Sequence, residues 1–237
     1  MMASNGVGAF VSHLPSAWLA VTVLAYVSAW KLYRRAGDSP FLLPVFTGSA
    51  LVIIILFATG TAYADYYAGA RPIHFLAGPA IVLLAVPLYK QWHHLRRLWL
   101  PLLVALAVGS VTAVVSAMAI AWFLGASTET LWSLAPKSST MPVGMAMAEQ
   151  TGGVASLTAV ATALTGIFGA IAAPYMLGRS RDSGPEVEGF ALGLAAHAIG
   201  TARALQTSET AGAFAALAMI LNAIATALLI WLASGWV

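Results

Sequence analysis

The sequence predicts an all-α protein that crosses a membrane several times, and its composition is the main reason. Of the 237 residues, 60% are hydrophobic and only 8% are charged, whereas a soluble domain carries about 25% charged residues. The mean hydropathy is +0.87. So few charged side chains cannot cover a surface that faces water, so the solvent must be lipid. The crossings use up the available length, and we expect one transmembrane domain over residues 1–237.

Charged residues mark where the long apolar stretches stop. Each crossing needs about 20 apolar residues, and tryptophan and tyrosine gather at the expected ends, as at a membrane interface. The sequence therefore predicts seven crossings, near Pro15–Tyr33, Phe41–Thr61, Pro72–Lys90, Leu98–Phe123, Val154–Met176, Val187–Gln206 and Ala211–Leu232.

The stretch Leu131–Glu149 differs from these because Pro136, Lys137 and Pro142 interrupt its apolar character. Proline lacks the backbone donor that a continuous helix needs. Irregular backbone is tolerated at membrane depth only where protein or a water-filled cavity surrounds it. We therefore expect either a broken crossing or a re-entrant segment.

Basic loops indicate the orientation. Lys31–Arg35 and Lys90–Arg97 are separated by two crossings and so lie on one side, which the positive-inside rule makes cytoplasmic. The N-terminus is then outside. The third basic loop, Arg179–Arg181, is cytoplasmic only if Leu131–Glu149 re-enters instead of spanning. This arrangement favours seven spans plus one re-entrant segment.

Lys137 is the first candidate for function, since a lysine within a membrane segment costs about 2.5–3.5 kcal/mol and tends to face a cavity or a partner. Ser138, Ser139 and Thr140 follow it directly. Together they form a candidate anion site, with the ammonium neutralising a carboxylate and the hydroxyls donating hydrogen bonds. In the alternative interpretation, Lys137 extends to the interface or pairs with Glu149.

His197, Gly200, Thr201 and Arg203 lie in the middle of the penultimate predicted crossing. His197 and Thr201 share a helix face. Unwinding at Gly200-Thr201 would expose a half-helix N-terminus, which favours an anion, and Arg203 could then contact a carboxylate with both of its donor groups. The alternative is that Arg203 caps the helix near the headgroups and that His197 is an interior residue with a hydrogen bond.

Three further positions complete the list. Glu149 and His197 are candidates for carrying a coupled proton, with Glu149 as the counter-charge of Lys137 in the alternative. Asn222 is expected to make a hydrogen bond between helices rather than to contact a substrate. Gly78-Pro79 is expected to break the third crossing for structural reasons.

Other classes of protein find no support in the sequence. No phosphate-binding glycine loop, zinc-protease motif, nucleophile elbow or pair of catalytic carboxylates occurs, so we predict neither an enzyme nor a cofactor or metal site. The net charge of +3 reflects cytoplasmic loops and does not indicate nucleic-acid binding. Spacings of small residues, such as Gly189-Phe-Ala-Leu-Gly193, fit close helix packing and are compatible with a homodimer.

From about Leu42 to Leu232 the chain resembles the LrgB/CidB family of bacterial membrane proteins. The resemblance lies in Ala64–Arg71, Phe75–Ala80, Ala85–Tyr89, Leu134–Ser138, Glu149–Gly153, His197–Gln206 and Glu209–Phe214. After the Lys-Ser pair the family usually reads Val-Thr-Thr-Pro, whereas this chain has Ser139-Thr140-Met141-Pro142. This departure bears on substrate preference more than on fold.

The resemblance implies two competing functions. Some members are described as holin-like or antiholin-like regulators of murein hydrolase export and cell lysis. Others act with a small LrgA/CidA-type membrane protein to move pyruvate or related carboxylates, and the plastid glycolate/glycerate translocator is similar to a fusion of the two. The family also looks similar to cation/proton antiporter and anion transporter folds, which implies inverted repeats with discontinuous helices.

Our hypothesis from the sequence is therefore a transporter, or transporter subunit, for small monocarboxylates such as pyruvate, glycolate or glycerate in the bacterial inner membrane. The expected partners are the lipid bilayer, the carboxylate and an LrgA/CidA-type protein. A lesion-forming holin needs no cationic interior pocket rich in hydroxyl groups. The alternative remains a holin/antiholin-like regulator of murein hydrolase export.

Overall fold

The structure is a computed structural model that describes residues 15–177 and 184–235, and every regular element in these ranges is a helix. The chain divides into two compact units, one up to Leu83 and the other from Leu84 onward. The expected single domain over residues 1–237 stays a prediction.

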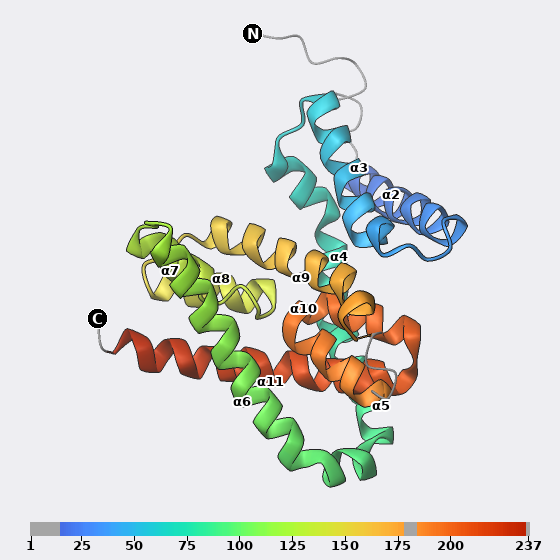
Figure 1. Ribbon diagram of the computed structural model, residues 1–237. Helices are drawn as coiled ribbons and strands as arrows, with labels where there is room; N and C mark the ends of the chain where they lie inside the picture. The colour runs from blue at the N-terminus through green and yellow to red at the C-terminus, as the bar shows by residue number, and fades with distance from the viewer. Residues whose placement is uncertain (1–14, 178–183, 236–237) are drawn as a thin grey trace. The chain divides into compact units, whose positions relative to one another are not determined.

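The first unit consists of α2 (Pro15–Arg35), the short 3₁₀ helix η1 (Pro40–Leu42), α3 (Pro44–Thr59) and α4 (Tyr63–Leu83) (Figure 1). Proline at the first position starts α3, and Gly60 ends it with a left-handed φ of 66°. Helix α2 packs against both α3 and α4. At Gly48 on α3, a Cβ would lie 3.5 Å from the Cα of Tyr26 on α2.

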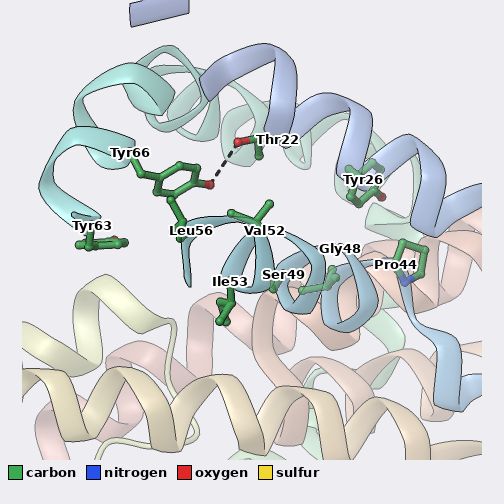
Figure 2. A pocket seen from close by; sticks show the side chains of 11 residues that line it. Thr22, Tyr26, Pro44, Gly48, Ser49, Val52, Ile53, Leu56, Tyr63 and Tyr66 are labelled. Carbon is green, nitrogen blue, oxygen red and sulfur yellow. Dashed lines mark hydrogen bonds between the residues drawn. The ribbon is translucent and has the colours of Figure 1, made fainter. Parts of the chain in front are cut away.

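A cavity of about 350 Å³ opens between the helices of the first unit. Its lining is largely apolar, and one polar contact lies in it, between the hydroxyl groups of Tyr66 and Thr22, 3.2 Å apart. Figure 2 shows the Tyr66 hydroxyl directed toward Thr22. The Tyr66 ring also packs edge-on against Trp18, with 5.8 Å between ring centroids. Tyr66 thus joins α4 to α2 by one polar contact and one aromatic contact.

The second unit contains the remaining helices. They are α5 (Ala85–Lys90), α6 (Trp92–Phe123), α7 (Thr128–Leu134), α8 (Met141–Gln150), α9 (Ala155–Leu177), α10 (Pro185–Thr207) and α11 (Glu209–Ser234) (Figure 1). Leu106, Phe190 and Phe214 form part of its apolar core, with one residue each from α6, α10 and α11. A Lys90–Glu209 ion pair of 2.6 Å joins α5 to the start of α11.

Helices α10 and α11 form the most tightly packed pair. A single residue, Ser208, connects them, and its hydroxyl accepts a hydrogen bond from the Ala211 amide to cap α11. A Cβ at Gly189 or at Gly193 would collide with the carbonyl oxygen of Ala211 or of Ala215, respectively. Only glycine permits this contact between backbones, as small-residue packing in membranes requires.

Four segments of the described chain are long and apolar enough to cross a membrane. They are Pro40–Thr59, which joins η1 to α3, and the helices α6, α9 and α11, with a fifth if the bent pair Tyr63–Ile73 and Gly78–Lys90 forms one span. Large apolar side chains on three of these segments face outward, among them Phe57 at 83%, Phe123 at 84% and Trp231 at 70% exposure. Lipid is the solvent that suits such surfaces.

The structure thus supports a multi-pass helical membrane protein with four or five crossings, and the count of seven stays a prediction. Helices α2 and α10 coincide with two predicted crossings but are not among the candidate spans. Helix α8 has 10 residues and α7 has 7. Neither can cross a core about 30 Å thick at about 1.5 Å per residue.

Candidate functional site

The first break in the helical chain lies between α7 and α8. Helix α7 ends at Leu134, and α8 begins at Met141 with Pro142 in its first turn. Between them the Pro136 carbonyl accepts hydrogen bonds from the Ser139 amide and the Ser139 hydroxyl, each at 2.9 Å. Ser138 is 4% exposed and Ser139 is 0% exposed. The break that the two prolines predict therefore turns its serines into the protein rather than toward lipid.

Lys137 lies in the same turn and is partly buried. Its Nζ donates a 3.5 Å hydrogen bond to Ser138 Oγ. In the described part of the chain, no carboxylate lies within ion-pair distance of this ammonium. Glu149 is exposed near the end of α8 and does not pair with it. The structure therefore gives no support to Glu149 as the counter-charge of Lys137.

Helix α9 holds this break in place. Ser133 Oγ accepts a hydrogen bond from the Val154 amide at 2.7 Å, and Thr158 Oγ1 donates to the Ser133 carbonyl at 2.8 Å. A Cβ at Gly153 would lie 2.8 Å from the Ser133 backbone nitrogen, so only glycine fits between them. The last turn of α7 is thus fixed to the start of α9 by one side chain from each.

The second break lies inside α10, at His197, which has the non-helical angles φ 42° and ψ −128°. Its Nε2 lies 2.9 Å from the Thr162 carbonyl on α9. Because a carbonyl only accepts, the ring must carry a hydrogen on Nε2. A Cβ at Gly166 would stand 2.6 Å from Cε1 of the ring. Glycine on α9 therefore leaves the space that the His197 ring occupies.

The position of this break differs from the sequence expectation, which placed unwinding at Gly200-Thr201. Gly200 is needed for close approach instead, because a Cβ there would collide with the Leu192 carbonyl oxygen across the bend. Thr201 is 3% exposed, and its hydroxyl donates to the His197 carbonyl at 2.9 Å. Arg203 lies six residues beyond His197 and is partly exposed.

Asn222 on α11 brings the two breaks together. Its Nδ2 donates to the Ser138 carbonyl at 2.8 Å and to the Leu194 carbonyl at 3.2 Å. Both carbonyl oxygens accept hydrogen bonds from the same nitrogen. The distance between the two oxygens therefore cannot exceed the sum of the two hydrogen-bond lengths. Its Oδ1 accepts from Ser110 on α6 at 2.7 Å. The predicted interhelical role of Asn222 is confirmed.

The arrangement offers one ammonium and several hydroxyl groups at the junction of two broken helices. No cluster of His, Asp or Glu that could hold a metal ion occurs within residues 15–177 and 184–235. Ser139 and Thr201 donate their hydroxyl hydrogens to backbone carbonyls, so Lys137 and Ser138 are the groups best placed to meet an anion. The site suits a small anion better than a cation.

Gly78 and Pro79 lie inside α4, in the first unit. Sequence reasoning missed Ser110, Ser133, Thr158, Thr162 and Gly166, which support the two breaks. The last three follow one another at intervals of four residues, which places them on one face of α9. This spacing of small and hydroxyl residues is the signal that could have revealed the three residues on α9.

Comparisons with known proteins place the chain in a family. The LrgB-like family matches residues 22–236. YxaC of Bacillus subtilis (strain 168), described as uncharacterized, is 38% identical over 86% of this chain and 88% of its own length. YwbG of the same organism, also described as uncharacterized, is 33% identical over 88% of this chain and 92% of its own.

A relative that carries a functional name is the antiholin-like protein LrgB of Bacillus mycoides (strain KBAB4), 28% identical over 90% of this chain and 92% of its own length. This name favours the regulator hypothesis over the carboxylate transporter. No solved structure shows significant similarity to the chain. The family match covers almost the whole sequence, and the chain therefore belongs to the LrgB-like family of membrane proteins.

Proposed function

We propose that this chain carries small monocarboxylates such as pyruvate, glycolate or glycerate across the bacterial inner membrane. One observation supports this most: Lys137 is a partly buried cation in a membrane protein, and no carboxylate in the described chain lies within ion-pair distance of it. A charge in such a place requires a partner. A substrate carboxylate would supply the missing negative charge.

In this proposal Lys137 and Ser138 bind the carboxylate directly. Ser139, Thr140, Gly200 and Thr201 shape the site, and Arg203 approaches the anion when the second half of α10 moves. His197 or Glu149 carries a coupled proton. These roles comprise binding and transport, without catalysis, and the proposal gives the two breaks the role that discontinuous helices have in carriers with inverted repeats.

The proposed topology has seven crossings and a cytoplasmic location for residues 179–181, which lie outside the described residues. Ser180→Cys tests it, because the chain contains no native cysteine. Labelling of this cysteine from the cytoplasmic side alone is expected, and labelling from outside alone would overturn the seven-span topology. An LrgA/CidA-type membrane protein and a second copy of the chain are the proposed partners.

The direct test is uptake of labelled pyruvate, glycolate and glycerate into proteoliposomes, with and without an LrgA-type partner. We expect accumulation of at least one of them under an imposed gradient, competition by the others, and no competition by neutral amide analogues. If none is transported in either preparation, the carrier proposal fails.

The second candidate is an antiholin-like regulator of murein hydrolase export and cell lysis, and the name of the Bacillus mycoides relative favours it. Its test is expression in a bacterial strain that lacks its own LrgB-like protein, with dye leakage and autolysis as the measurements. A change in autolysis that survives Lys137→Met would support the regulator. A change that Lys137→Met removes would trace the lysis phenotype to carboxylate transport.

A further inference from the structure

Asn222 has the geometry of a residue that fixes two broken segments against each other. It is 0% exposed, and each hydrogen of its amide group has its own acceptor, one at each break. Both acceptors are backbone carbonyls, which cannot donate, so the orientation of the amide is determined: Nδ2 faces the breaks and Oδ1 faces Ser110.

The bond to Leu194 reaches the carbonyl that lies just before the break in α10. In a continuous helix the Leu194 carbonyl would pair with the amide of Ala198, on the far side of His197. His197, with its non-helical backbone angles, lies between these two residues. Asn222 supplies a donor from another helix, and it does the same for the Ser138 carbonyl in the turn before α8.

We propose that Asn222 is a positioning residue that makes the two breaks move together. If either break moves, the hydrogen bond between its carbonyl and the Asn222 amide is lost in a region that water does not reach. A shift at the Lys137 turn is therefore transmitted to the second half of α10 through one side chain. The inference deepens the proposed function, on which it rests for the ligand at the Lys137 turn.

The test uses three buried alanines as sites for single cysteines. Ala135 lies at the first break and is 1% exposed, Ala204 lies beyond the second break and is 0% exposed, and Ala213 lies near the start of α11 and is 0% exposed. The rate of alkylation by N-ethylmaleimide is measured at each, in the purified full-length protein. Asn222→Asp replaces the donor by an oxygen that faces two carbonyl oxygens.

Asn222→Asp is expected to raise the alkylation rates at Ala135→Cys and Ala204→Cys together, by about tenfold or more, and to leave Ala213→Cys within about twofold. The matched control is Thr226→Val, because Thr226 is equally buried one turn along α11 and its hydroxyl has no hydrogen-bond partner among the described residues. This control should change none of the three rates.

Ser110→Ala removes only the third hydrogen bond and serves if Asn222→Asp does not fold. It should raise both break rates together, by about two- to threefold. A rise at one break alone, or an equal rise at Ala213→Cys, would overturn the proposal with either variant. Unchanged rates at both breaks would do the same.

Pyruvate provides a readout that a purely structural residue would not change. In the cysteine variants that keep Asn222, saturating pyruvate should slow alkylation at both breaks. In those that also carry Asn222→Asp, pyruvate should protect Ala135→Cys alone. Protection of both cysteines in Asn222→Asp would contradict the coupling. If pyruvate protects neither cysteine in the Asn222 protein, the carboxylate proposal fails, and the ligand-free rates still decide the role of Asn222.

Discussion

The two units of this chain bury different kinds of side chain. In the described part of the first unit, the buried residues are apolar or aromatic, such as Trp18, Tyr33 and Val52. In the described part of the second unit, ten Ser, Thr, His or Asn residues are buried, and Asn222 and Ser139 are 0% exposed. Buried polar groups are costly unless they are hydrogen-bonded. This concentration is the reason why we place the proposed site in the second unit.

The largest expected effect comes from Lys137→Met, which removes the ammonium of the candidate site and leaves the length of the side chain nearly unchanged. Hydrogen bonds to charged groups contribute about 1.5–3 kcal/mol, so kcat/KM for pyruvate uptake should fall about 10- to 100-fold. The matched control is Lys31→Met on the exposed end of α2, which should change uptake less than about twofold. Equal losses of pyruvate uptake in both variants would contradict the placement of the site in the second unit.

Glycine-to-alanine changes compare how the two units pack. A Cβ at Gly193 would lie 2.7 Å from the Cα of Ala215, whereas the nearest atom to a Cβ at Gly48 is 3.5 Å away. Gly193→Ala should therefore lower the free energy of unfolding by about 1–3 kcal/mol. Gly48→Ala should raise it by up to about 1 kcal/mol, because alanine favours the helix. Thermal unfolding in detergent measures both, and shifts of the same sign would contradict the comparison.

Backbone strain in the second unit can be separated from the loss of the imidazole ring. His197→Ala and His197→Gly both remove the bond to the Thr162 carbonyl, but only glycine adopts a φ of 42° and a ψ of −128° freely. The glycine variant should be more stable than the alanine variant by about 1 kcal/mol. An alanine variant of equal or greater stability in the same melting assay would show that this position is unstrained.

The smallest effect is expected in the first unit. Tyr66→Phe removes a single 3.2 Å contact with Thr22, so its cost should stay below about 1 kcal/mol. Pyruvate uptake should not change, because the cavity of Figure 2 lies in the unit without the candidate site. A clear loss of uptake would mean that the first unit takes part in transport.

Some features of the fold follow directly from the sequence. The prolines on either side of Lys137 predict the interruption of the helix there, since proline removes a backbone donor. The membrane character follows from the scarcity of charge. Asn222 carries an amide deep in an apolar helix, and an amide in such a place must find partners on other helices.

Other features leave no local signal. The break at His197 places a residue other than glycine at positive φ, and such a position is stable only because surrounding contacts determine it. Here those contacts include the Thr162 carbonyl and the space beside Gly166. The number of crossings could not be read either, because hydropathy does not distinguish a segment that faces lipid from one that folds back inside the protein.

The position of Asn222 in the chain has a consequence for biosynthesis. The turn before α8, the α9 residues Thr158, Thr162 and Gly166, and both halves of α10 are all translated before α11. Until α11 is inserted, the Ser138 and Leu194 carbonyls lack the amide that bonds them in the finished protein. The candidate site is therefore assembled last, and a chain that stops before α11 would hold Lys137 without the contact that joins its turn to α10.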